Sequence, residues 1–207
     1  NVLLVLDEVI SGFGRTGKWF ASETYGIEHI DLMCLAKGIT SGYIPLSAVM
    51  VCDRVANTLI EKGGEFFHGF TYSGHPVSCA VALENIRLLE EEKIVETVGN
   101  ITGPYFAEQL ATLADHPVVG EVRALGLIAA VELVSNSQTM EPIENQDEIC
   151  EVFRTIALKL GIITRPIHAT ILLTPPLVIS IEEIDFLVTN FRKALDQWRT
   201  LLPGDSQ

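Results

Sequence analysis

The sequence predicts an α/β fold, with a mainly parallel sheet in residues 1–114 and a smaller α+β unit in residues 115–207. In the first part, apolar runs of strand length alternate with segments of helical periodicity, which is typical of a layered α/β sheet. In the second part, short strands follow one another around glycine and proline turns, and a long amphipathic helix closes the pattern. The 207 residues, 48% of them hydrophobic, suffice for one large or two small cores.

The first part contains three apolar runs that predict buried strands, at Val2–Leu6, Asp31–Ala36 and Leu46–Cys52. Their apolar interiors fit strands that are covered on both faces. The stretch Phe66–Pro76 is rich in aromatic residues and glycine, which predicts a loop with special backbone needs.

Two helices are predicted in the same part. Asp53–Lys62 begins with Asp53 in the position of an N-cap and is followed by two glycines that end it. Val77–Lys93 carries an apolar stripe at helical spacing, formed by Ala82, Leu83, Ile86 and Leu89. Apolar strands and helices thus occur together here, which we interpret as part of a mainly parallel sheet with helical connections.

The second part predicts four short strands, a polar loop and two helices. The strands are expected at Val118–Val122, Leu127–Leu133, Ile162–Arg165 and Ile171–Leu173, the last two flanking a loop around Pro166. Residues 135–146 are polar and predict a surface loop. The helices are expected at Ile149–Leu160 and Ile181–Leu201.

The charge balance excludes some classes of partner. Asp and Glu total 27 against 14 Lys and Arg, a net charge of −13, and no basic cluster is present. Nucleic acids and anionic membranes need a concentrated positive surface, so we expect neither as a partner. No apolar run approaches the roughly 20 residues that span a bilayer, so we expect no membrane segment.

The four cysteines, at positions 34, 52, 79 and 150, lie far apart without C-x-x-C spacing. This favours reduced, mostly buried thiols in a cytoplasmic protein, with no disulfide and no metal site.

The chain starts at Asn1 and enters an apolar run at once, whereas termini normally lie at the surface. We therefore expect the C-terminal part of a longer chain, in which an N-terminal targeting segment cannot be judged.

Asp7 and Lys37 are the residues most indicative of chemistry, because each follows an apolar run. A carboxylate at the end of a buried strand usually has a cationic partner, since its desolvation is expensive. A desolvated lysine has a lowered pKa and can form an imine. Together they suggest pyridoxal phosphate (PLP), held covalently by Lys37 and protonated at its ring nitrogen opposite Asp7.

A P-loop ATPase is the rival interpretation. An apolar run ending in Asp-Glu is typical of a magnesium-binding strand, and residues 12–18 match the glycine and lysine spacing of a phosphate loop. Trp19, however, stands where that loop needs Ser or Thr. The order is also wrong, because a phosphate loop precedes the Asp strand. The match is therefore a motif outside its structural context.

Three strings, Leu6–Lys18, Leu35–Ala48 and His68–Pro76, occur in the order and spacing of one family. Through them the chain resembles the class III, or ω-, aminotransferases, PLP enzymes of fold type I. The resemblance covers nearly the whole chain and is strongest to the pyruvate-dependent ω-transaminases. It implies the second half of a large PLP-binding domain followed by the C-terminal small domain.

The resemblance assigns roles to three residues near the cofactor. Asp7 would face the pyridine nitrogen, and Val9 would pack against the ring. Lys37 would form the internal aldimine and later transfer the proton to and from the substrate. Ile10 departs from the ornithine-like branches, which carry a glutamine there, and this favours pyruvate as acceptor.

Two further residues are implied at the edges of the site. Thr71 would reach the phosphate of the neighbouring subunit's cofactor in a homodimer, and Arg165 would bind the carboxylate of the α-keto acid. His68, His75 and Arg15 are interpreted as structural, and Trp19 and Phe20 as packing residues.

The resemblance implies an aminotransferase that moves an amino group from an amine or ω-amino acid to an α-keto acid, with pyridoxamine phosphate as the halfway form. Aminomutases and decarboxylases of the family share Asp7, Lys37 and Thr71, so these alternatives stay open. The upstream glycine-serine phosphate loop of the family is not among these 207 residues, and we expect the chain to be inactive alone. A fragment that folds or dimerises without catalysis is the non-enzymatic alternative.

Overall fold

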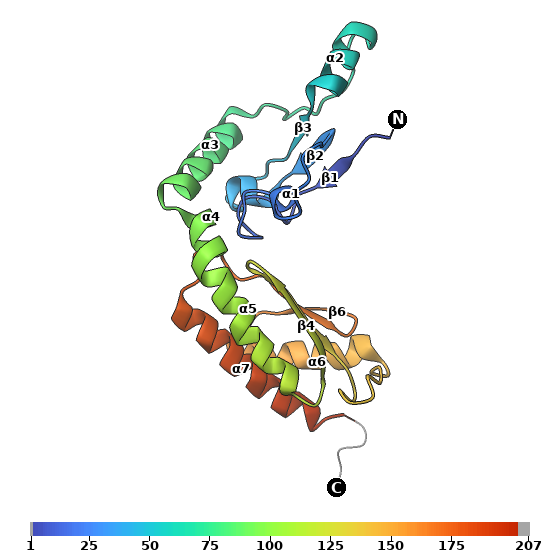
Figure 1. The fold of residues 1–207 in the computed structure, drawn as a ribbon, viewed down its shortest axis with the longest axis vertical. Helices are drawn as coiled ribbons and strands as arrows, with labels where there is room; N and C mark the ends of the chain where they lie inside the picture. Colours follow the sequence, from blue (N-terminus) through green and yellow to red (C-terminus); the bar gives the residue numbers. More distant parts are fainter. Residues whose placement is uncertain (1, 203–207) are drawn as a thin grey trace. The chain divides into compact units, whose positions relative to one another are not determined.

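The structure is a computed structural model, which describes residues 2–202. The chain forms two compact units, Asn1–Gly99 and Asn100–Gln207 (Figure 1). Within residues 2–202, no helix combines the length and apolar character needed to cross a membrane.

A three-stranded sheet forms the centre of the first unit, in the order β1-β2-β3. Strands β1 (Val5–Asp7) and β2 (Leu32–Leu35) are parallel, and Asp7 lies opposite Cys34. Strand β3 (Ala48–Val51) pairs with β2 in the antiparallel direction. The strand pair that leads to Asp7 and Lys37 is thus parallel, and the third strand reverses direction.

Helix α1 (Ala21–Thr24) and the 3-10 turn η1 (Lys37–Thr40) connect these strands. After β3 the chain forms α2 (Asp53–Lys62), α3 (Pro76–Glu91), α4 (Ile94–Thr97) and the π-helical turn η2 (Val98–Thr102), which leads into the second unit. Helix α2 has the predicted bounds, but Cys52 and not Asp53 is its N-cap residue. Asp53 lies in the first turn, where its negative charge still favours the helix dipole. The predicted apolar stripe of α3 holds at Ala82 and Leu89, whereas Leu83 is 70% exposed.

The strands of the first unit are more exposed than the sequence predicts. Val5 and Val49 are each 55% exposed, and Met50 is 59% exposed. Helix α3 contacts the turn η1, and within the described residues no helix covers the sheet closely. The prediction of buried strands is therefore wrong for β1 and β3, whereas β2 is half-buried and ends in the buried Leu35. An apolar strand is buried only where another element packs on it.

The second unit contains a four-stranded antiparallel sheet in the order β4-β5-β7-β6. The strands are β4 (Val119–Leu125), β5 (Ile128–Leu133), β6 (Arg165–Ile167) and β7 (Thr170–Leu173). Pro166 lies inside β6 and not in the predicted loop, which is possible because β6 is an edge strand that needs fewer ladder donors.

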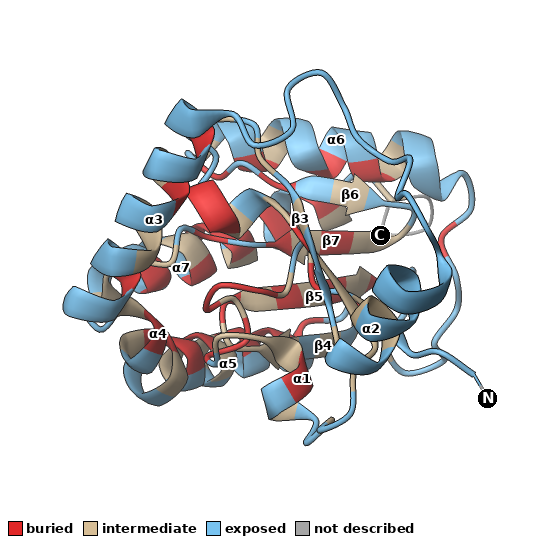
Figure 2. Cartoon of the chain, turned by 90° about the horizontal axis from the view of Figure 1, so that it is seen from above, coloured by how far each residue is buried: buried red, intermediate tan, exposed pale blue. Residues whose placement is uncertain are grey.

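Helices α5 (Gly103–Ala111), α6 (Gln146–Lys159) and α7 (Ile181–Arg199) pack around this sheet, with the 3-10 turn η3 (Thr112–Asp115) after α5. Ser180 caps α7 in a capping box with Glu183, which explains why the helix begins there. Fully buried rings of Phe153, Phe191 and Trp198 join α6 to α7, with centroids 5.1 and 6.0 Å from that of Phe153. Figure 2 shows the buried stretches of β5 and β7 in red.

The boundary between the two units lies between Gly99 and Asn100, before α5, whereas the sequence predicts a domain division between residues 114 and 115. Helix α5 contacts both α7 and β4, so it belongs with the second unit. The division into domains 1–114 and 115–207 stays a prediction.

All four cysteines are free, but only Cys150 is buried, so the prediction of mostly buried thiols is wrong. Cys79 is exposed because it lies on the outer face of α3.

Candidate active site

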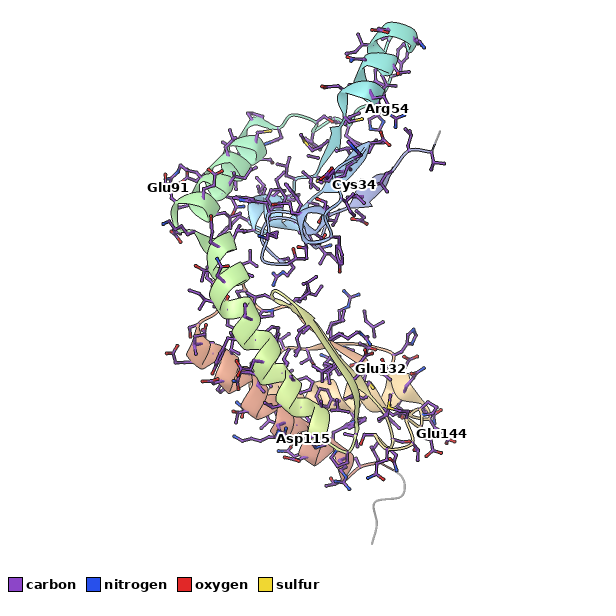
Figure 3. All side chains as sticks on the ribbon, in the orientation of Figure 1. Cys34, Arg54, Glu91, Asp115, Glu132 and Glu144 are labelled. Atoms are coloured by element: carbon purple, nitrogen blue, oxygen red, sulfur yellow. The ribbon has the colours of Figure 1, made fainter. Side chains whose placement is uncertain are left out.

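Asp7 and Lys37 leave the sheet at the same edge. Asp7 is the last residue of β1, and Lys37 follows the last residue of β2 by two positions. Because parallel strands end at one edge, both side chains start from the edge where ligands bind in α/β sheets. Figure 3 labels Cys34, the β2 residue opposite Asp7.

The local backbone presents both side chains to solvent. Asp7 is exposed, and its Oδ1 accepts a hydrogen bond from the Val9 backbone N–H at 3.1 Å. Lys37 is exposed and begins η1 with φ of 45°, in the left-handed region. Such a conformation costs on the order of 1 kcal/mol for a residue with a Cβ and tends to occur at functional sites. Within residues 2–202 neither side chain takes part in an ion pair.

Glu8 organises the loop that follows Asp7, a role that the sequence pattern did not predict. Its side chain is 2% exposed and accepts backbone N–H bonds from Ala21 at 3.0 Å and Ser22 at 2.8 Å, together with the hydroxyl of Ser11. A carboxylate buried with three donors is compensated for its lost hydration. Side chains alternate between the two faces along a strand, so the position of Glu8 after Asp7 indicates that it points to the opposite face.

The loop after Asp7 packs against the turn that carries Lys37. A Cβ on Gly38 would lie 2.9 Å from the Cβ of Phe13 and 3.2 Å from the carbonyl oxygen of Gly12, so only glycine fits there. Phe13 is buried and its ring meets that of Phe20 edge-on at 5.6 Å. Glu8 therefore holds a loop that in turn supports the backbone next to Lys37.

Thr71 lies in the exposed loop before α3. His75 is the N-cap of this helix, and its Nδ1 accepts the backbone N–H of Ser78 at 3.4 Å, which agrees with a structural role. His68 contacts the rings of Phe66 and Phe70. Thr71 is thus presented at the surface on a loop rich in exposed aromatic side chains.

The remaining predicted residues are placed as follows. Val9 is half-buried directly after the Asp7 turn, and Ile10 is 55% exposed. Arg165 is the exposed first residue of β6, opposite Leu172 of β7, and belongs to the second unit. Arg15 is half-buried, and burial lowers the pKa of its guanidinium.

These residue types fit PLP. An exposed carboxylate at a strand end can hold a protonated pyridine nitrogen, an exposed amine at the same edge can form an imine, and a hydroxyl on a loop before a helix can bind a phosphate. Within the described residues no cluster of His, Cys, Asp and Glu suits a metal ion.

Comparison with known proteins agrees with this chemistry. Residues 1–195 match the Aminotransferase class-III family. The chain is 51% identical over 197 residues to a putrescine–pyruvate aminotransferase of Pseudomonas aeruginosa, which covers 95% of the chain and 42% of that protein. It is 41% identical to the chloroplastic gamma aminobutyrate transaminase 3 of Solanum lycopersicum, over 94% of the chain and 38% of that protein. The chain therefore spans about two fifths of the length of these relatives.

Solved structures show the same fold. The ω-transaminase of Pseudomonas jessenii in complex with PMP has a TM-score of 0.92 and 39% identity, covering 98% of this chain and 45% of that one. An (S)-enantioselective ω-transaminase of Thermomicrobium roseum has a TM-score of 0.90 and 43% identity, over 95% and 44% of the two chains. The chain belongs to the class III aminotransferase family and has part of the PLP-dependent fold type I architecture.

Proposed function

We propose that the whole protein is a PLP-dependent aminotransferase that moves an amino group from an amine or ω-amino acid to an α-keto acid. The observation that carries this proposal is the shared sheet edge of Asp7 and Lys37, where a carboxylate and an amine both lie exposed and, among residues 2–202, have no ion-pair partner. The family to which the chain belongs supports it.

Each proposed residue has a distinct task. When bound, PLP supplies a ring that accepts the electron pair released as the donor C–H bond breaks. The carboxylate of Asp7 keeps a proton on the ring nitrogen, because an adjacent negative charge raises the pKa of that nitrogen. The amine of Lys37 would take the proton from the donor carbon and pass it to the cofactor, and it would reverse this transfer in the second half of the reaction. The guanidinium of Arg165 binds the carboxylate of the acceptor through two parallel hydrogen bonds.

Pyruvate is the proposed acceptor, and a diamine such as putrescine is the first donor to test. Two observations support this choice: Ile10 stands where the ornithine-like branches carry glutamine, and a relative that is 51% identical is named a putrescine–pyruvate aminotransferase. The relatives named gamma aminobutyrate transaminases make an ω-amino acid the second donor to test.

The test is formation of alanine from pyruvate by the whole protein with putrescine or γ-aminobutyrate as donor. Lys37→Ala should lower the rate by at least about 1,000-fold, since it removes both the covalent attachment and the proton carrier. Lys18→Ala, which alters an exposed lysine of the loop after Asp7, is the matched control and should retain activity. Borohydride reduction should attach the cofactor to Lys37. Amine turnover that needs no keto acid would overturn the aminotransferase assignment.

We also propose a homodimer in which Thr71 reaches the phosphate of the neighbouring subunit's cofactor. The loop around Thr71 exposes four aromatic side chains: Phe66 at 68%, Phe67 at 87%, Phe70 at 76% and Tyr72 at 79%. An apolar patch of this kind is typical of an interface and unfavourable in water. We propose a second copy of this chain as the partner that covers the patch, because its cofactor phosphate would then lie within reach of the Thr71 hydroxyl.

Mixed dimers test this arrangement. A Lys37→Ala subunit and a Thr71→Ala subunit each lack one part of a site, but a mixed dimer rebuilds one complete site from both chains. Random mixing should restore about a quarter of the wild-type activity, since half of the dimers are mixed and each has one intact site. Activity that never rises above that of the separate variants would place Thr71 in its own subunit's site.

A further inference from the structure

Asn85 of helix α3 binds the turn that carries Lys37 through three hydrogen bonds. Its Nδ2 donates to the carbonyl oxygens of Gly38 at 2.9 Å and Ile39 at 3.2 Å. Its Oδ1 accepts the hydroxyl of Ser41 at 2.6 Å. One half-buried side chain thus contacts three of the four residues that follow Lys37.

The partners determine the orientation of the Asn85 amide. Carbonyl oxygens only accept hydrogen bonds, so the amide nitrogen must face Gly38 and Ile39, and the hydroxyl of Ser41 must then donate to the amide oxygen. No other residue type of this size supplies two donors and one acceptor in this fork.

The turn needs such an external contact. It is short and is bounded by two left-handed residues, Lys37 with φ of 45° and Ser41 with φ of 48°. Each of these conformations costs on the order of 1 kcal/mol, and one 3-10 turn adds few hydrogen bonds to offset that. On its other side the turn is supported by Phe13, which packs on Gly38. The turn is therefore held between an apolar contact from the loop after Asp7 and a polar contact from α3.

We infer that Asn85 is a positioning residue, which holds the backbone of the Lys37 turn so that the amine keeps its place at the sheet edge. This inference rests on the proposed function, because it assigns Asn85 a role through Lys37. Asn85 itself need not touch the cofactor or the substrate.

Hydrogen exchange in the cofactor-free whole protein tests the structural step. The amides of Ile39, Ser41 and Tyr43 donate to the carbonyl oxygens three residues earlier, in the turn or next to it, and report its opening. In Asn85→Asp, an oxygen of equal size replaces the donor and faces two carbonyl oxygens, so exchange in residues 37–43 should accelerate at least about tenfold. Glu84→Gln, one position earlier on α3, is the matched control and should leave this exchange unchanged. Unchanged exchange in Asn85→Asp would overturn the inference.

Kinetics of the PLP-loaded enzyme test the functional step. Asn85→Asp should lower kcat by about 10- to 100-fold, because a small misplacement of a reacting group has effects of this size. The KM for pyruvate should stay within about twofold, since carboxylate binding does not use this turn. A merely structural role would lower the unfolding temperature but leave kcat at 25 °C unchanged, and that result would overturn the inference.

Two further variants, Ser41→Ala and Lys37→Ala, show whether the positioning role of Asn85 or the proposed function has failed. Ser41→Ala removes one of the three bonds and keeps both carbonyl contacts, so its effects on exchange and kcat should be smaller than those of Asn85→Asp. If Lys37→Ala left catalysis intact, the proposed function would fail, while the exchange result would still stand. If Lys37→Ala abolished catalysis and Asn85→Asp did not lower kcat, only the positioning role would fail.

Discussion

The two units of the chain contain similar apolar sequence but bury it to different degrees. In the second unit, Phe106, Phe153, Phe191 and Trp198 are completely buried between the helices and the sheet. In the first unit, Val5, Val49 and Met50 are more than half exposed on the strands themselves. The unit with the candidate catalytic residues is therefore the one whose sheet is open, and the unit with Arg165 has a closed core.

The two units are therefore stabilised by different kinds of interaction. The second unit is stabilised by burial of its own aromatic rings, whereas side-chain hydrogen bonds such as those of Glu8 and Asn85 hold the loops and turns of the first unit. Apolar burial and hydrogen-bonded loops respond to different substitutions, so the comparison can be tested directly.

The largest expected effect is in the closed core. Phe153→Ala should lower the free energy of unfolding by about 3–5 kcal/mol, because it leaves a cavity between α6 and α7. Met50→Ala, on the open strand β3, should lower it by less than about 1 kcal/mol. Urea unfolding of the chain of residues 1–207, followed by tryptophan fluorescence, measures both. Equal losses would show that β3 is covered in solution and would remove the contrast between the units.

An intermediate effect is expected at Glu8. In Glu8→Gln an amide N–H₂ must face a donor, either the backbone N–H of Ser22 or the pair formed by Ala21 and Ser11. A buried donor left without an acceptor costs about 1–3 kcal/mol, and we expect a loss of stability in that range. Thermal unfolding measures it, with Glu28→Gln at an exposed position as control. A loss no greater than that of the control would mean that Glu8 does not hold the loop.

The smallest effect concerns His116 in the second unit. Burial lowers the pKa of His116 from its ordinary 6.5, assisted by Arg192 and Arg199, and opposed by Asp196. The folded state therefore binds this proton less readily than the unfolded state. The stability that follows is fully present above pH 6.5 and is lost as the pH falls towards the lowered pKa, by at most about 1.4 kcal/mol per pH unit.

Unfolding midpoints measured between pH 7.5 and 5.5 test this, because His116→Gln should flatten the pH dependence. The exposed His168, which pairs with Asp147, supplies the control variant His168→Gln. A wild-type slope that persists in His116→Gln would assign the pH dependence to another group.

Much of the fold could be predicted where local signals were strong. Helix α2 has the predicted bounds, and α7 begins as predicted, at the residue after its Ser180 capping box. The apolar runs before Asp7 and Lys37 do form neighbouring strands. These features depend on residues close in sequence, which a pattern can read.

Other features depend on contacts that no local pattern contains. Nothing predicted α5, because residues 94–111 combine two glycines, a proline and a π-helical turn in an otherwise helical run. The exposure of β1 and β3 depends on which elements cover them. For the candidate site, the pair Asp7 and Lys37 could be found from the strand ends, whereas the hydrogen bonds of Glu8 and Asn85 join residues up to 47 positions apart.

The open edge of β1 has a practical consequence for anyone who produces this chain by itself. In the described sheet β1 pairs only with β2, and the adjoining Val2–Leu6 segment is apolar, uncharged and free of proline. Segments of this kind add strands from other molecules and grow into cross-β aggregates. The net charge of −13 opposes association in general, but none of it lies on this segment. Solubility of the isolated chain should therefore depend more on a charged residue placed at Leu3 or Val5 than on further acidic residues elsewhere.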